Sequence, residues 1–149
     1  MGTIKMNKLI YIAAPLFSVA ELEFNEKVDC SLRRMGFNTF LPQRDGHLLS
    51  SLLSEGYSKE EATQKIFEMD VDQIKKSDIV LFILDGRVPD EGACVEIGLA
   101  YAYGKECIGY KTDSRSLMGN SNNPLIVGIL KNRIATSHHE LKNLLKGFY

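Results

Sequence analysis

The sequence predicts an α/β fold in which a parallel sheet is covered by helices on both faces. Short apolar, β-rich segments alternate along the chain with longer segments of helical periodicity. The segment 78–86, DIVLFILDG, is apolar almost throughout, which is typical of a central parallel strand buried on both sides. The chain has 149 residues, 44% of them hydrophobic, which is enough for one sizeable core. We therefore expect a single domain over residues 1–149.

The first third of the chain predicts two strands around one helix. The run KLIYIAAP (8–15) is apolar and ends in a proline, as a strand would. Segment 18–36 has helical periodicity from an N-cap serine, Ser18, to a terminal glycine. The short run FNTFLP (37–42) predicts a second strand that also ends in a proline.

The next two segments predict a long loop and a long helix. Residues 43–58, QRDGHLLSSLLSEGYS, are mostly polar and contain glycines, so we expect a loop with one helical turn. Segment 58–77 begins with a capping box, Ser58 and Glu61, and places apolar side chains on one face. This segment is predicted to be helical throughout.

The same alternation continues to the end of the chain. The predicted elements are the strand 78–86, a helix that begins at Asp90, the strand 106–112, a polar loop 113–123, a short helix 124–130, an edge strand 132–137 and an amphipathic helix 138–149.

Strands that alternate with helices favour right-handed crossovers and a parallel sheet. We predict a flavodoxin-like sheet of five strands in the order 2-1-3-4-5. In such sheets a ligand binds beyond the carboxyl ends of the strands, at the switch point between strands 1 and 3. The loops that follow the strands, residues 15–18, 85–91 and 113–123, hold most of the polar and glycine residues that the core does not explain.

Composition excludes several classes of protein. The formal net charge is −1, so no global field attracts nucleic acid or an anionic membrane. Three widely spaced cysteines, without a signal peptide, favour reduced thiols in the cytoplasm, and we expect neither a disulfide nor a zinc site. The longest apolar runs have the length of a strand and are too short to cross a bilayer.

The stretch DEGACVEIGLAYAYGKE (90–106) contains an unusual acid. Asp90 is placed to begin a helix, where a carboxylate caps free amides and favours the positive end of the helix dipole. Glu96 lies six residues later among small and apolar residues, with no charged neighbour within four positions. A carboxylate is costly in such a setting, which favours a functional role for Glu96.

Three other residues are candidates for the same site. Asp70 borders the buried stripe of its predicted helix, although a solvated surface position is an equally good interpretation. Tyr11 is placed to hydrogen-bond Glu96 or simply to pack in the core. Phe17 is placed either to stack on a planar base or to act as a hydrophobic staple before Ser18. Carboxylates around a small pocket suit glycosyl transfer, since one attacks the anomeric carbon while another group protonates the leaving base.

Five segments together resemble the nucleoside 2-deoxyribosyltransferase family. They are IYIAAPLF, MDVDQIKKSDIVLFIL, DEGACVEIGLAYAYGK, YKTDSR and NNPLIVG, and they span nearly the whole chain. The resemblance implies that Glu96 is the nucleophile that attacks C1′ of a 2′-deoxynucleoside, oriented by Tyr11. It further implies that Asp90 and Asp70 bind the nucleobase and manage its proton. No metal and no cofactor are implied.

The resemblance also implies an oligomer, a dimer or a hexamer. Asn123 matches an asparagine that reaches the sugar hydroxyls from a neighbouring subunit, although from sequence alone it is equally a helix cap before Pro124. Tyr149 resembles the family's aromatic C-terminus near the site. Gln43 stands where the family places a base-recognising amide, with Arg44 or Asp45 as alternatives. The sequence therefore leaves the choice between purine and pyrimidine bases open.

Other functions remain as alternatives. A 2′-deoxynucleoside 5′-monophosphate N-glycosidase would share the glutamate and would bind phosphate through residues such as Arg87, Ser114 and Arg115. The apolar PLF after the first strand argues against it. In a receiver-like signalling module Asp85 would be the phosphorylated aspartate. Such a module also needs acids after strand 1 and a lysine after strand 5, and the sequence lacks them there. A flavin module lacks a phosphate-binding loop. The three histidines form no metal-ligand pattern with the cysteines and are expected at the surface.

Overall fold

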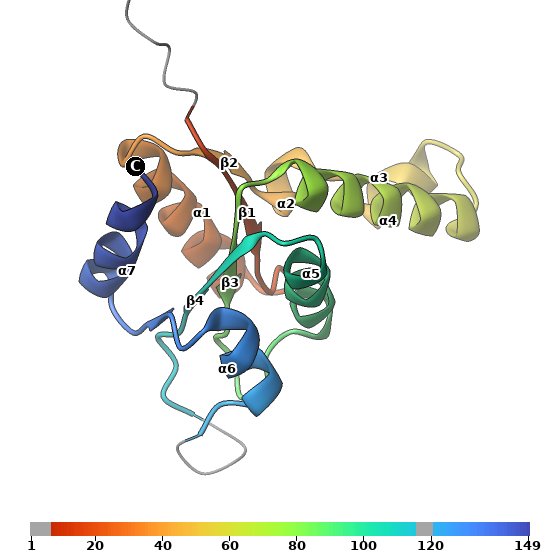
Figure 1. The fold of residues 1–149 in the computed structure, drawn as a ribbon. Coiled ribbons are helices and arrows are strands. Elements are labelled where there is room, and N and C mark those ends of the chain that lie inside the picture. The colour runs from red at the N-terminus through yellow and green to blue at the C-terminus, as the bar shows by residue number, and fades with distance from the viewer. Residues whose placement is uncertain (1–6, 116–120) are drawn as a thin grey trace, which may run out of the picture.

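The computed structural model describes residues 7–115 and 121–149, and within them the chain forms one parallel sheet of five strands (Figure 1). The strand order is β2-β1-β3-β4-β5, which confirms the predicted order. The strands are β1 (Leu9–Ala13), β2 (Asn38–Phe40), β3 (Ile79–Ile83), β4 (Glu106–Tyr110) and β5 (Ile134–Ala135). Each neighbouring pair of these strands is parallel, so the carboxyl ends of all five meet at one edge of the sheet.

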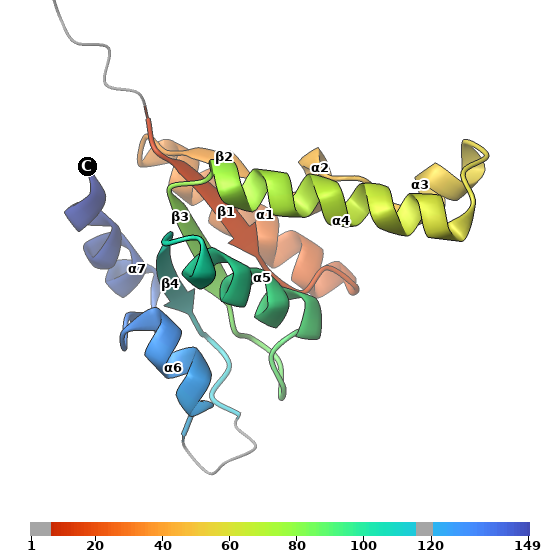
Figure 2. The same cartoon turned by 45° about the vertical axis from the view of Figure 1, so that its right-hand side comes forward.

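Helices connect the strands and cover both faces. They are α1 (Val19–Arg34), α2 (Pro42–Asp45), α3 (Leu49–Ser54), α4 (Lys59–Lys76), α5 (Glu91–Ala102), α6 (Pro124–Leu130) and α7 (His138–Leu145), followed by a 3₁₀ turn, Lys146–Phe148. Figures 1 and 2 show α1 and α7 on one side of the sheet and α5 and α6 on the other, with the C-terminal part of α4 on the same side as α5.

The two faces have separate cores because successive strand side chains point in opposite directions. From β1, Ile10 and Ile12 join the core beneath α1 and α7. Tyr11 and Ala13 join the core beneath α4, α5 and α6. Strand β3 is buried along its whole length, as its continuous apolar sequence predicts. A tyrosine in the middle of β1 is thereby directed toward α5.

The capping residues behave as the sequence predicts. Ser18 and Glu21 form a capping box at α1, and Ser58 and Glu61 form one at α4. At α5 the Asp90 carboxylate accepts a hydrogen bond from the Ala93 amide at 2.9 Å. Each cap satisfies amides that the first turn of a helix leaves unpaired.

The expectation of one helical turn in residues 43–58 is wrong, because two short helices form there. Pro42 begins α2 and does not close a strand, which its fixed φ angle allows at the first helical position. Helix α3 has no side-chain cap and is stabilised by packing, since Leu52 is buried and α3 lies against α4. Figure 2 shows this pair projecting from the body of the domain. The helix expected over 138–149 ends at Leu145.

Among the described residues, none of the helices has the length and apolar character needed to cross a membrane. The three cysteines, Cys30, Cys94 and Cys107, are free, as expected.

Candidate active site

The site is centred on a hydrogen bond between the middle of the sheet and α5. The Tyr11 hydroxyl donates to Glu96 Oε1 at 2.7 Å. Tyr11 is completely buried, and its ring stacks on Phe40 of β2 with 5.3 Å between ring centroids and a 13° angle between planes. Because this ring cannot move freely, its hydroxyl holds one oxygen of the Glu96 carboxyl group in a fixed position.

Two further acids surround this pair, as the sequence suggests. Asp70, near the C-terminal end of α4, interacts with the Tyr11 hydroxyl, and Asp70 and Asp90 both act electrostatically on Glu96. Asp70, Asp90 and Glu96 are all partly buried. The structure therefore brings together four predicted residues from β1, α4 and α5.

Burial dominates the electrostatics of the cluster. It raises the pKa of Glu96 to about 8, with smaller contributions from the charges of Asp70 and Asp90, whereas the hydrogen bond from Tyr11 lowers that pKa. Burial also raises the pKa of Asp70, to about 6. The pKa of Tyr11 is raised well above its ordinary range by burial and by the two nearby acids, so its hydroxyl stays protonated and remains a donor. Interacting carboxyl groups of this kind titrate as a unit and retain a proton near neutral pH.

The raised pKa of Glu96 has a measurable effect on stability. Folding raises this pKa from 4.5 to about 8, so the folded state binds the proton more tightly than the unfolded chain. The resulting stabilisation is complete below pH 4.5 and is lost as the pH rises through about 8. We expect Glu96→Gln, which cannot ionise, to raise the melting temperature above that of the wild type at pH 9 but not at pH 5. Thermal unfolding at both pH values measures this difference, and an equal change at both would contradict it.

The sequence does not predict that His47 lies near the cluster. His47 lies between α2 and α3, and its positive charge acts on Asp70, where it lowers the pKa. The side chain is exposed and forms no hydrogen bond with the described residues. In the sequence His47 is 23 residues from Asp70, and only the folding of α3 back along α4 brings the two together. No pattern in the sequence signals this contact.

The side chains expected near the base have different environments. Phe17 is 81% exposed, so it does not pack as a staple on α1 and is free to contact a ligand. The Gln43 amide is engaged by α1: its oxygen accepts from Asn25 Nδ2 at 3.0 Å, and its Nε2 donates to the Leu22 carbonyl at 3.0 Å. A role of Gln43 in base recognition stays a prediction.

The alternatives to Gln43 form ion pairs. Arg44 contacts both Asp29 and Asp45, each at 2.6 Å, and Asp29 is buried. The side-chain hydrogen bond from Arg44 lowers the pKa of Asp45, and the Leu41 amide and the positive charges of Arg44 and Arg33 add to this effect. These contacts fasten α2 to α1 and so fix the start of the segment that carries His47.

Asn123 and Tyr149 do not join the cluster within one chain. Asn123 caps α6, with its Oδ1 accepting from the Leu125 amide at 2.9 Å, and it is exposed. Tyr149 stacks on Phe37 at 5.3 Å, beside the start of β2 and at the opposite edge of the sheet from the carboxyl ends of the strands. Figure 1 shows the C-terminus close to the start of β1.

Two residues that the alternative functions would use, Asp85 and Arg115, form contacts within the chain. Asp85 accepts hydrogen bonds from the Thr112 amide at 2.6 Å and the Asp113 amide at 2.9 Å, so it ties two loops together. Arg115 is paired with Asp113 at 2.6 Å. Within residues 7–115 and 121–149 no group of three potential metal ligands occurs.

Comparisons with known proteins agree with this arrangement. The sequence profile described as nucleoside 2-deoxyribosyltransferase matches residues 10–145. A sequence comparison with curated proteins finds no match. A solved structure of a conserved protein from Enterococcus faecalis V583 has a TM-score of 0.80 at 24% identity, covering 96% of this chain and 99% of that one.

Two solved 2-deoxyribosyltransferases are also similar. The enzyme from Bacillus psychrosaccharolyticus has a TM-score of 0.66 at 27% identity and covers 82% of each chain. The enzyme from Leishmania mexicana has a TM-score of 0.67 at 18% identity, covers 95% of this chain and 99% of its own, and supports the shared fold. With a profile match over most of its length and a carboxylate cluster at the sheet, the chain belongs to the nucleoside 2-deoxyribosyltransferase family.

Proposed function

We propose that this protein transfers 2-deoxyribose from one nucleobase to another through a covalent intermediate on Glu96. The observation that carries the proposal is the 2.7 Å hydrogen bond by which the buried Tyr11 hydroxyl holds the Glu96 carboxyl group. Two other acids lie close enough to affect the Glu96 pKa, so a nucleophile and a proton donor are present together.

In the first step a Glu96 carboxylate oxygen attacks C1′ of the 2′-deoxynucleoside. The bond between C1′ and the base nitrogen breaks, its electron pair goes to the base, and the base receives the proton that the cluster retains. The productive form has an ionised Glu96 and the proton on Asp70, whose pKa burial raises to about 6. Protonation makes the base a better leaving group, which is the purpose of a raised carboxyl pKa.

In the second step a nitrogen of another base attacks C1′, displaces the Glu96 carboxylate and returns a proton to the cluster. Two inversions give net retention at C1′. Water competes with the incoming base, so the bound base and the surrounding side chains must exclude it. Phe17, exposed beyond the end of β1, is our candidate for stacking on the base and covering the site.

The complete site contains residues from a neighbouring subunit in this proposal. Asn123 is exposed and caps α6, which is compatible with contact to the sugar hydroxyls of the next subunit. Tyr149, at the opposite edge of the sheet, would also act across an interface in a dimer or hexamer. We place the enzyme in nucleoside salvage in the cytoplasm, a compartment in which its free cysteines stay reduced.

A product analysis tests the proposed reaction. Deoxyinosine and adenine are incubated with the enzyme, and the appearance of deoxyadenosine with hypoxanthine shows transfer. Free deoxyribose without deoxyadenosine would show a hydrolase and overturn the proposal. A parallel incubation with deoxyinosine 5′-monophosphate tests the alternative monophosphate N-glycosidase, which would cleave this substrate in preference to deoxyinosine.

Asp90→Asn separates capping from catalysis. Asparagine caps a helix as well as aspartate does, so the hydrogen bond to the Ala93 amide and the fold are retained. Asparagine does not exchange a proton, and we expect the variant to bind nucleoside while base exchange slows by about 10²-fold. Steady-state exchange and thermal unfolding are measured together. Unchanged exchange would reduce Asp90 to a capping residue.

A further inference from the structure

Asn25 of α1 is a polar residue that the fold buries. We propose that Asn25 is a positioning residue for base binding, which holds the Gln43 amide and the loop that carries Phe17 in the arrangement that receives a nucleobase. This inference rests on the proposed function, because Gln43 and Phe17 are the side chains expected to contact the base. Asn25 itself is assigned no role by the sequence patterns or by the family resemblance.

The burial of Asn25 is costly. Its side chain belongs to a residue that is only 2% exposed, and a buried amide is unfavourable unless its groups are paired. The other polar residues that the described chain buries are Asp29 and Ser77. Asp29 pairs with Arg44, and Ser77 donates to a backbone carbonyl of α4. The Oδ1 of Asn25, in contrast, is buried without a hydrogen-bond partner among the described residues. An unpaired acceptor destabilises the fold, which indicates that the amide is present for its donor group, Nδ2.

The Nδ2 group of Asn25 joins two separate segments. It donates to the Pro15 carbonyl at 2.8 Å, in the loop after β1, and to Gln43 Oε1 at 3.0 Å, in α2. The opposite orientation of the Asn25 amide would place its oxygen against these two acceptors, so the network fixes which end is the donor. Both hydrogens of one buried nitrogen therefore tie the loop after β1 to the segment after β2.

The Gln43 amide is held at both of its ends. Asn25 fixes the oxygen, and the nitrogen donates to the Leu22 carbonyl of α1 at 3.0 Å. Each end keeps one further hydrogen-bonding capacity, a lone pair on Oε1 and an N–H on Nε2. A fixed glutamine amide with one free donor and one free acceptor matches the edge of adenine, and its ordering costs nothing when the base binds. The bond from Asn25 is what sets the plane of this amide.

The same residue holds the loop that carries Phe17. Pro15 is tied to Asn25 at the start of this loop, and the Phe17 amide donates to the Glu21 carboxylate at 2.9 Å at its end. The backbone of Phe17 is thus fixed although its ring is exposed. Asn25 consequently sets the position of a stacking candidate relative to an amide that comes from a different segment.

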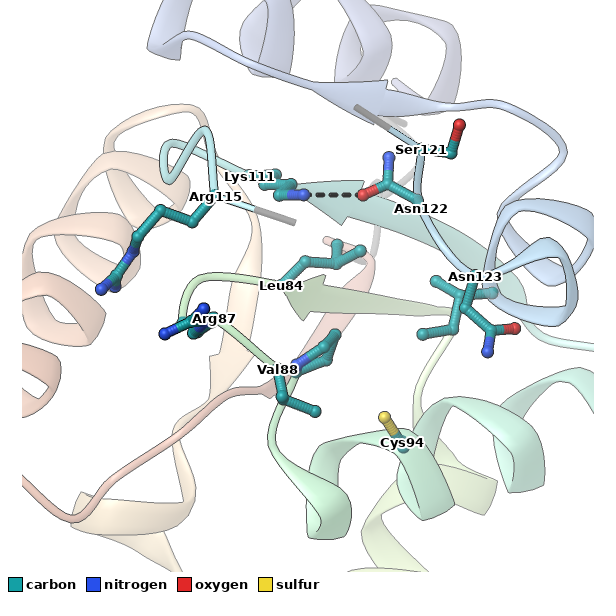
Figure 3. A pocket seen from close by; sticks show the side chains of 12 residues that line it. Leu84, Arg87, Val88, Cys94, Lys111, Arg115, Ser121, Asn122 and Asn123 are labelled. Atoms are coloured by element: carbon teal, nitrogen blue, oxygen red, sulfur yellow. Dashed lines mark hydrogen bonds between the residues drawn. The ribbon is translucent and has the colours of Figure 1, made fainter. Parts of the chain in front are cut away.

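The cavity shown in Figure 3 is separate from this network. That cavity, of about 210 Å³, lies between the ends of β3 and β4 and the first turns of α5 and α6. Asn25, Pro15 and Gln43 do not line it. Substitution of Asn25 therefore tests the part of the site beside β1 and β2.

Isothermal titration of the full-length protein with deoxyadenosine tests the inference, in a Glu96→Ala background that prevents turnover. Asn25→Asp keeps the shape of the side chain and replaces its donor by an oxygen, and Asn25→Ala is a second variant that adds no charge. We expect each to weaken deoxyadenosine binding by about tenfold when Gln43 is present, and by less than about threefold when Gln43 is already replaced by Gln43→Ala. A purely structural role predicts equal losses in the two backgrounds.

Ser77→Ala is the matched control, because it removes another buried side-chain donor, at the C-terminal end of α4. It should lower the melting temperature and leave the affinity for deoxyadenosine unchanged. Equal losses with and without Gln43, or an unchanged affinity in both Asn25 variants, would overturn the positioning role while leaving the proposed transfer intact. Tight binding that depends on Asn25, together with no transfer by the wild type, would instead overturn the transfer alone. Absence of deoxyadenosine binding at millimolar concentration with Asn25 intact would overturn both.

Discussion

We expect Glu96→Ala to lower the rate of base exchange by at least about a thousandfold, because in the proposed mechanism it removes the atom that bonds to C1′. The fold should survive, since Glu96 is only partly buried and the core beneath α5 is formed by other side chains such as Ala93 and Ile97. Exchange between deoxyinosine and adenine provides the rate, and circular dichroism checks the fold. Activity within tenfold of the wild type would end the assignment of Glu96 as the nucleophile.

The matched control for this variant is Glu91→Ala. Glu91 belongs to the same helix and has the same side chain, but it is exposed in the first turn. We expect it to keep most of the activity and to lose a small amount of stability, because an acid at a helix N-terminus is favourable. A single-turnover experiment adds a second readout. Without an acceptor base, wild-type protein should release hypoxanthine in a burst equal to the number of sites, and Glu96→Ala should release none.

We expect Tyr11→Phe to lower kcat of the proposed reaction by about ten- to a hundredfold, the range for loss of one hydrogen bond to a charged group. Phenylalanine retains the ring that stacks on Phe40, so packing changes little. The hydrogen bond from Tyr11 lowers the pKa of Glu96, and its loss therefore raises that pKa further. Since the nucleophile must be ionised, the pH of maximal activity should move upward.

The pH profile of kcat and kcat/KM distinguishes this positioning role from a purely structural one. Tyr110→Phe serves as the control, because Tyr110 is also a buried strand tyrosine but belongs to the core beneath α1 and α7. It should change stability without moving the pH optimum. An unchanged profile in Tyr11→Phe would show that the hydrogen bond does not set the ionisation of Glu96.

The regular part of the fold is predictable because local signals and tertiary structure agree there. The fully apolar β3 and the capping box at Ser58 and Glu61 each have a single interpretation, and the structure confirms both. The segment 43–58 differs because its helices depend on tertiary contacts. Pro42 is compatible with a strand end and with a helix start, and α3 forms without a cap, through burial of Leu52 against α4.

The candidate site likewise contains some contacts that the sequence suggests and others that depend on tertiary structure. The sequence leaves Tyr11 open between core packing and a hydrogen bond to Glu96, and the family resemblance implies the bond, which the structure contains. The proximity of His47 to Asp70 depends on how residues 43–58 fold, and no sequence pattern predicts it. The partners of Gln43 also depend on tertiary structure, since Asn25 and Leu22 are separated from it by a strand.

In the proposed mechanism, the group that attacks the sugar and the segment expected to recognise the base belong to different parts of the molecule. The proposed nucleophile, Glu96, is held by Tyr11 of the inner strand β1, whose ring is packed on Phe40. Gln43, the candidate for base recognition, belongs instead to the irregular segment between β2 and α4. Replacing residues 43–57 by those of another family member should therefore change which nucleobase the enzyme accepts. The reaction at the sugar should remain the same. Diversification of such enzymes would then proceed by exchange of this segment.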